Sequence, residues 1–107
     1  MAQTRSVIWT GKSGEEYRYW VHPIATRFEA TPANYIYAKV VARKWRVVYI
    51  GETGDLSERM LDTHDKKDCI TRSGATRIHE HISSDDEEER RAEEADLIGR
   101  YIPPCND

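Results

Sequence analysis

The stretch that decides the fold is residues 34–60, NYIYAKVVARKWRVVYIGETGDLSERM. β-Branched and aromatic residues dominate residues 34–42 and again residues 46–51, and both compositions favour β-strands. Between them lies the polar segment Arg43-Lys-Trp-Arg46, which is typical of a solvent-facing turn and also suited to contact a nucleic-acid backbone. This pattern predicts a β-hairpin with a basic tip.

The residues after this hairpin predict a helix and then a loop. Thr53 or Asp55 can cap a helix that runs to about Asp65, with an apolar stripe of Leu56, Met60 and Leu61. The following ten residues, 65–74, read DKKDCITRSG and are polar. We expect them to form a loop.

Strand patterns also occur before and after this central stretch. The runs SVIWT, residues 6–10, and YRYWVHPI, residues 17–24, flank a glycine-bearing loop and predict another hairpin. The segment TRIHEHI, residues 76–82, fits both a helical face and a strand face, and we favour a short third strand. A helix should start after Ser84, with Glu87 completing a capping box, and end before Pro103.

These elements predict an α+β fold, with a small antiparallel sheet flanked by helices. Residues 1–33 form an amino-terminal hairpin extension, and residues 34–107 form the main part of one compact domain. The length of 107 residues is sufficient for such a domain without disulfides. We therefore expect Cys69 and Cys105 to be free thiols, as they would be in a reducing compartment.

Composition limits the class of protein. With 33% charged and 38% hydrophobic residues, the chain contains no apolar run near the roughly 20 residues that cross a bilayer. It also lacks the pattern of a secretory signal, which predicts a cytoplasmic location. The net charge of −3 combines +4 in residues 1–79 with −7 in residues 80–107. A mildly basic body is compatible with phosphate binding on one face.

Four separated elements resemble one known family. They are Tyr35-Ile36-Tyr37, then Tyr49-Ile50-Gly51, then Arg59 ten residues after Tyr49, and finally the segment 94–106, EADLIGRYIPPCN. Together, in this order and spacing, they resemble the GIY-YIG nucleases over residues 34–106. The resemblance implies the fold expected above and a metal-dependent enzyme that cuts the phosphodiester backbone of DNA.

The resemblance also implies roles for individual residues. Glu94 would hold a Mg²⁺ or Mn²⁺ ion, because such ions prefer oxygen ligands together with several retained waters. Arg59 would brace the phosphate with paired donors. The remaining candidates would orient the attacking water, relay a proton or fix the local geometry: Tyr37, Tyr49, His64 and Asn106.

The expected partner is DNA, and RNA is not excluded. Exposed cations for its backbone are Arg43, Lys44, Arg46, Lys66 and Lys67. No membrane partner is expected. A single site of this kind cuts one strand per event, so double-strand cutting requires a dimer, rebinding or a second domain, and a homodimer is one of these options.

Two departures from the family pattern support other interpretations. Tyr35 stands where the first motif has glycine, and Glu52 adds a negative charge beside the second motif. Glu52 and the net negative charge favour a catalytically weak or inactive nucleic-acid-binding or protein-interaction module with the same fold. A small zinc protein is a third interpretation, using His64, His79, His81 and Glu94.

Overall fold

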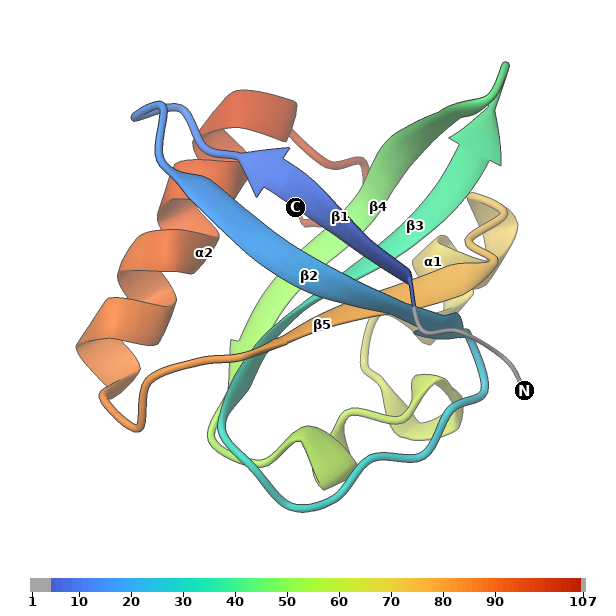
Figure 1. The fold of residues 1–107 in the computed structure, drawn as a ribbon. Helices are drawn as coiled ribbons and strands as arrows, with labels where there is room; N and C mark the ends of the chain where they lie inside the picture. Colours follow the sequence, from blue (N-terminus) through green and yellow to red (C-terminus); the bar gives the residue numbers. More distant parts are fainter. Residues whose placement is uncertain (1–4, 107) are drawn as a thin grey trace.

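A computed structural model of the protein describes residues 5–106 and has an α+β fold. Its centre is a curled, five-stranded antiparallel sheet (Figure 1). The strands are β1 (Arg5–Thr10), β2 (Glu16–Pro23), β3 (Ala33–Val41), β4 (Lys44–Thr53) and β5 (Arg77–Ile82), in the spatial order β1-β2-β5-β3-β4. Two helices complete it, α1 (Lys67–Arg72) and α2 (Glu87–Tyr101), with two 3-10 turns, η1 (Leu56–Glu58) and η2 (Leu61–Thr63).

The β3–β4 hairpin confirms the central sequence prediction, with a tighter tip than expected. Ala42 and Arg43 both have positive φ, 51° and 66°, and β4 already begins at Lys44. Two consecutive residues with positive φ are typical of the hairpin turns whose twist matches that of the strands. The pairing shifts register between Tyr37 and Ala38, which marks a bulge.

The segment with two interpretations, residues 76–82, forms strand β5 and lies between β2 and β3. Val21 of β2 and Ile36 of β3 are both paired with His79 of β5. Through this pairing, β1 and β2 belong to the same sheet as β3 and β4. The first strands of the chain therefore build the central sheet directly.

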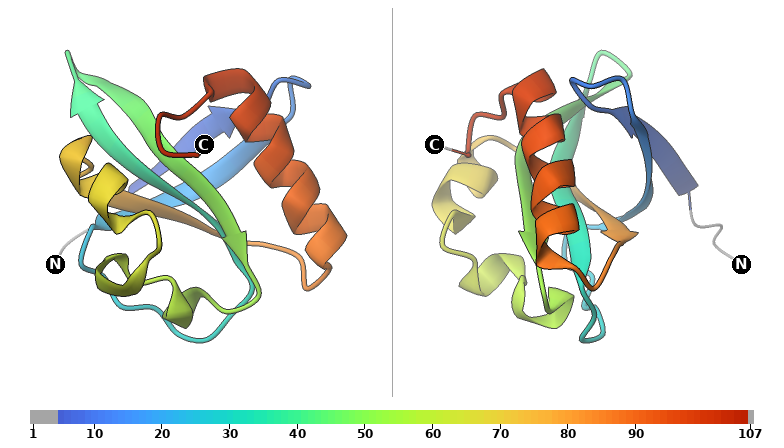
Figure 2. Two further views of the ribbon diagram at one scale, coloured as in Figure 1. Left: turned by 180° about the vertical axis from the view of Figure 1, so that it is seen from behind. Right: turned by 90° about the vertical axis from the view of Figure 1, so that its left-hand side faces the viewer.

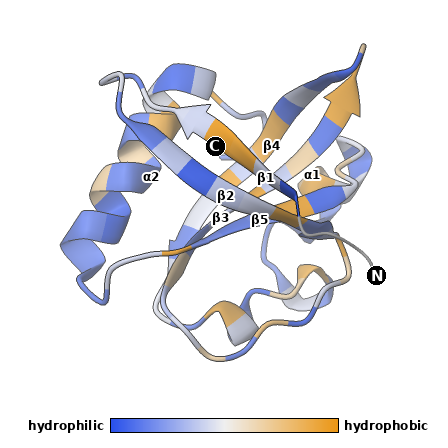
Figure 3. Cartoon of the chain, in the orientation of Figure 1, coloured by the Kyte–Doolittle hydropathy of each residue, from blue (hydrophilic) through white to orange (hydrophobic). Residues whose placement is uncertain are grey.

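The two faces of the sheet carry separate buried clusters. Figure 2 shows α1 and the 3-10 turns on one side of β3 and β4, with β1 and β2 on the other. The first side buries Tyr35, Tyr37, Leu56, Ile70 and Ile78, while the second buries Trp9, Tyr19, Ile36, Ile50 and Leu97. Each fully buried large apolar side chain contributes about 1.5–3 kcal/mol. Helix α2 is mostly hydrophilic (Figure 3), and the residues that it buries are Arg90, Glu93 and Leu97.

The helix predicted from Thr53 or Asp55 to Asp65 is wrong, because η1 and η2 replace it. Asp55 caps only the first turn, where its carboxylate accepts from the Ser57 N–H. The Arg59 carbonyl accepts a hydrogen bond from the Tyr37 hydroxyl at 3.2 Å. Met60 then has extended backbone angles. A tertiary hydrogen bond and an extended residue therefore interrupt the helical pattern.

Three further expectations are corrected. Residues 67–72 of the predicted loop form α1, which buries Ile70. The two predicted free thiols, Cys69 and Cys105, are joined in a disulfide that connects α1 to the carboxy-terminal tail. The first cap of α2 is Asp86 instead of Ser84, although acidic residues do occupy its first turn as predicted. Within residues 5–106, no helix has the length and apolar character needed to cross a membrane.

Candidate functional site

A concave pocket of about 270 Å³ lies beside β3 and β4. Alternation along a strand directs residues two positions apart to the same face, so Tyr35 and Tyr37 of β3 face the side that η1 and η2 cover. The pocket is lined by Tyr35, Tyr49, Glu52, Glu58, Arg59, Thr63, His64 and Asp65. The structure therefore brings together three of the predicted catalytic residues, Tyr49, Arg59 and His64.

Glu94 of α2 lies close to this group. Its carboxylate is half-buried, and burial raises its pKa, as does the negative charge of Glu52. The Glu52 backbone N–H donates a hydrogen bond to it and opposes this rise. The charge of Glu94 in turn raises the pKa of Tyr49, although burial of the Tyr49 ring is the larger cause. Glu94 and Tyr49 therefore act on each other electrostatically.

Tyr35, which sequence reasoning did not include among the site residues, links Tyr49 to His64. The Lys66 N–H donates to His64 Nδ1 at 3.0 Å, and burial lowers the pKa of His64. Asp65 Oδ1 also lies 3.2 Å from Nδ1, and Nε2 lies 2.9 Å from the Tyr35 hydroxyl. A hydrogen bond from the Tyr35 hydroxyl lowers the pKa of Tyr49. Alternation from Tyr37 is the sequence signal that places Tyr35 here.

The hydroxyl of Tyr37 bonds to the backbone of Arg59. Tyr37 is buried, and its hydroxyl donates to the Arg59 carbonyl. Burial, followed by the charge of Asp62, raises the pKa of Tyr37 to about 12. The Arg59 side chain is exposed at the pocket, where its charge lowers the pKa of Tyr35 and of Tyr49. In this structure Tyr37 thus positions the backbone that carries Arg59.

The side chain of Asn106 bonds to the outer edge of β4, the strand that carries Tyr49. Its side-chain oxygen accepts from the Ile50 N–H at 2.8 Å, and its amide nitrogen donates to the Ile50 carbonyl at 2.7 Å. The neighbouring Cys105 N–H donates to the Val48 carbonyl at 3.1 Å. Because Tyr49 lies between these two anchored residues of β4, the tail fixes its backbone.

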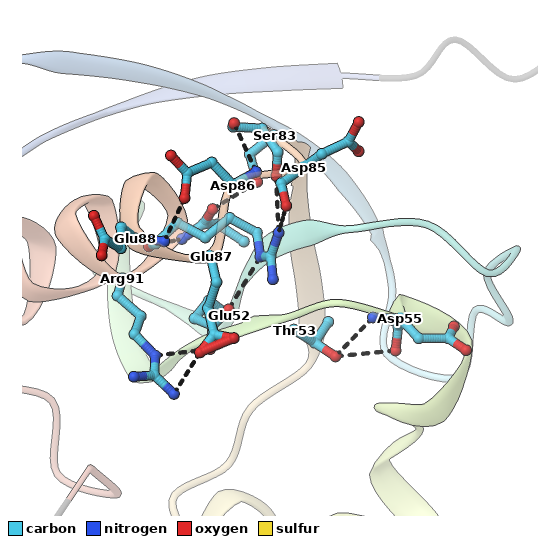
Figure 4. A network of polar contacts seen from close by, with 12 residues as sticks. Glu52, Thr53, Asp55, Ser83, Asp85, Asp86, Glu87, Glu88 and Arg91 are labelled. Carbon is cyan, nitrogen blue, oxygen red and sulfur yellow. Dashed lines mark hydrogen bonds and ion pairs between the residues drawn. The ribbon is translucent and has the colours of Figure 1, made fainter.

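The carboxylate of Glu52 contacts two arginines of helix α2. One carboxylate oxygen accepts from Arg90 Nε at 3.0 Å, and the other lies 3.8 Å from Arg91 Nε (Figure 4). Buried Arg90 also donates to the carbonyls of Ser84 and Asp85, near the start of the helix. The extra acid noted in the sequence therefore joins α2 to β4 at the pocket.

The donors present are compatible with one magnesium-type ion at Glu94. Mg²⁺ is bound by one or two carboxylates together with waters and substrate phosphates, and a nearby cation would hold this half-buried carboxylate in its ionised form. Among residues 5–106, no group of three or more His, Cys, Asp or Glu side chains is arranged so that it could hold a metal ion. His79 accepts from the indole of Trp9, and His81 bonds to Glu93, both away from His64.

The predicted substrate cations occupy two regions. Arg43, Lys44 and Arg46 are exposed near the hairpin tip, and the six residue steps from Arg43 to Tyr49 correspond to about 20 Å of strand. Lys66 and Lys67 lie at the start of α1, directly after the pocket residues His64 and Asp65. Only the second pair adjoins the pocket along the chain.

Comparison of the chain with protein-family models, curated proteins and solved structures gave no match.

Proposed function

We propose that the protein is a metal-dependent nuclease of the GIY-YIG type, which hydrolyses phosphodiester bonds in DNA. The observation that carries this proposal is the pocket where Tyr49, Arg59 and His64 meet beside the half-buried Glu94. An arginine, a carboxylate and ordered hydroxyls are the groups that phosphodiester hydrolysis requires. They supply phosphate binding, a metal ligand and a means of orienting water.

The side chains have distinct roles in this proposal. Arg59 binds the nonbridging oxygens of the scissile phosphate with its planar pair of donors. Tyr49 orients the attacking water and, once Arg59 and a bound cation offset the raised pKa of its phenol, accepts the proton of the water as the water oxygen bonds to phosphorus and the bond to the departing oxygen breaks. Tyr35 stabilises the phenolate of Tyr49 by donating to it, and His64 holds Tyr35 in place.

Glu94 would hold the divalent ion, and Asn106 keeps Tyr49 on a fixed strand. When bound, such an ion supplies neutralisation of charge on the phosphate and on the departing oxygen. The cost of ionising Glu94 in its half-buried setting is lowered by this positive charge.

The test is nicking of supercoiled plasmid with Mg²⁺ or Mn²⁺. We expect the parent protein to convert the plasmid to the open-circular form, and Glu94→Gln and Arg59→Ala to lose this activity while remaining folded by circular dichroism. Exposed Glu89→Gln on the same helix is the matched control and should retain activity. Absence of metal-dependent cutting by the parent on plasmid, branched and single-stranded DNA would overturn the proposal.

One observation favours a second candidate, a binding module without catalysis. The Tyr35 ring fills the space over Gly51, where a Cβ would lie only 2.5 Å from it. A ring at this position occupies space over Gly51 that substrate would otherwise enter. Under this candidate, Tyr35→Gly would open the pocket and create or raise cutting, whereas the nuclease proposal expects the same change to lower it.

A further inference from the structure

A second hollow, of about 540 Å³, opens near the tip of the β3–β4 hairpin. Its lining includes four cations, Arg5, Lys39, Arg43 and Arg77, and contains neither Asp nor Glu. They come from the starts of β1 and β5, the end of β3 and the hairpin turn. Segments far apart in the sequence therefore place positive charge around one concavity, which we call the basic hollow.

The cations of the basic hollow lack a neutralising carboxylate among the residues that the structure describes. Within residues 5–106, none of the four forms an ion pair with a carboxylate. Lys39 Nζ donates to the Ser73 carbonyl at 2.7 Å, and Arg77 donates to the Thr76 carbonyl at 2.9 Å. These bonds hold two of the cations in place without cancelling their charge. A concave cluster of unpaired cations attracts anions.

The buried ring of His79 responds to this positive charge. Burial lowers the pKa of His79 to about 4, and the charges of His22, Arg5 and Arg77 act in the same direction. Trp45, which lines the basic hollow, packs edge-on against this ring with centroids 4.6 Å apart. The charge of the hollow thus extends to the core beneath it.

The basic hollow also offers apolar surface. Trp45 is half-buried, and Val40 is 53% exposed beside it. Figure 3 shows the apolar end of β3 next to the hydrophilic start of β4. Cations combined with an aromatic ring match single-stranded nucleic acid, whose unpaired bases need a stacking or apolar surface while its phosphates need positive charge. A duplex keeps its bases stacked inside and would leave this apolar surface unused.

We propose that the basic hollow binds a single-stranded segment of nucleic acid, with phosphates at the arginines and a base against Trp45 and Val40. This inference rests on the proposed nuclease function where it assigns the substrate class: DNA that carries a single-stranded arm next to the site of cutting. Binding at the hollow is otherwise independent of the pocket, since Arg43 lies about 20 Å along the strand from Tyr49.

Fluorescence anisotropy tests the proposal with a labelled oligothymidine of about 12 nucleotides. The protein is titrated in chelator, so that no cutting occurs, at several salt concentrations. The double variant Arg43→Gln/Arg77→Gln should bind at least about tenfold more weakly, and its salt slope should fall by about 1.4, because each phosphate contact to a single strand contributes about 0.7. Arg27→Gln/Arg100→Gln removes the same charge from exposed residues outside the hollow, and should bind nearly as the parent does.

An equal loss of affinity in the two double variants would overturn the proposal, because it would indicate general attraction to the positive charges of the surface. So would a blunt duplex that competes as well as unlabelled oligothymidine. Plasmid nicking separates this proposal from the nuclease. If the parent nicks but Arg43→Gln/Arg77→Gln binds oligothymidine normally, only the hollow proposal fails. If Glu94→Gln and the parent both bind and neither nicks, only the nuclease proposal fails.

Discussion

The pocket beside Tyr49 and the basic hollow near Arg43 lie on the same pair of strands but are built differently. The pocket combines one arginine with acids, hydroxyls and an imidazole, and several of these groups bond to one another. The hollow has four cations, no acid among its lining residues and few internal bonds. Substitutions in the pocket should therefore change the rate of the reaction, whereas those in the hollow should change affinity and its dependence on salt.

The largest effect is expected at Glu94. Glu94→Gln keeps the shape but removes the charge of the candidate metal ligand. Losing about 4 kcal/mol of charge stabilisation corresponds to a decrease in the nicking rate of about a thousandfold. Single-turnover nicking measures this rate, with oligothymidine binding as the second readout. If Glu94→Gln also bound oligothymidine more weakly, the pocket and the hollow would not have separate roles in catalysis and binding.

Arg59→Lys should have the next largest effect. Lysine retains the positive charge but lacks the planar pair of donors, so phosphate in the transition state is held less well. We expect a decrease in kcat of roughly a hundredfold with little change in the salt slope of binding. If the rate were retained, Arg59 would act only as a general positive charge, like the cations of the hollow.

Tyr35→Phe should shift the pH dependence of cutting. Donation from the Tyr35 hydroxyl lowers the pKa of Tyr49, so its removal raises that pKa and moves the rising limb of the rate profile to higher pH. At a fixed pH on that limb, the rate falls about tenfold when the midpoint moves up by about one pH unit. The other charges acting on Tyr49 are Glu94, Asp65 and Arg59, and all of them remain.

The control for this measurement is Tyr37→Phe, whose hydroxyl bonds to the Arg59 carbonyl. This control should lower stability or kcat without moving the midpoint of the pH profile. If the two variants gave the same midpoint, the link from Tyr35 to Tyr49 would have no catalytic role.

The smallest effect is a change in acid stability. His79 is neutral in the folded protein with a pKa of about 4, whereas an unfolded histidine has a pKa of about 6.5. Below about pH 6.5 the unfolded state binds more protons, so the free energy of unfolding should fall as the pH drops towards 4. Replacing Arg77 by Gln should raise the pKa of His79 and so narrow the pH range over which the free energy of unfolding falls. NMR titration of the ring measures the change in pKa, and an unchanged value would mean that the hollow's charge does not reach the core.

The sequence identified the strands because their signal is local. Runs of β-branched and aromatic residues mark β3 and β4, and the acidic cluster before α2 matches its first turn. Residues 53–74 were predicted poorly because tertiary contacts decide their structure. The Tyr37 hydroxyl binds the Arg59 carbonyl, and one buried side chain with a disulfide stabilises the short helix α1.

The sequence predicted which residues belong to the candidate site better than it predicted the hydrogen bonds between them. Spacing singled out Tyr49, Arg59 and His64, which share the pocket. It could not reveal that the Tyr37 hydroxyl faces a backbone carbonyl while Tyr35 bonds to His64, since both lie on one strand face. Spacing also carried no information about the basic hollow, whose cations come from three separated segments, β1, the β3–β4 hairpin and β5.

The tail that anchors β4 also bears on self-association. β4 is an edge strand, and the unpaired N–H and C=O groups of an edge are a template on which another chain can add a strand. Asn106 occupies both of these groups at Ile50, and Cys105 occupies the Val48 carbonyl. The disulfide between Cys105 and Cys69 ties this cover to α1. Loss of the last few residues would therefore expose a strand edge and favour aggregation.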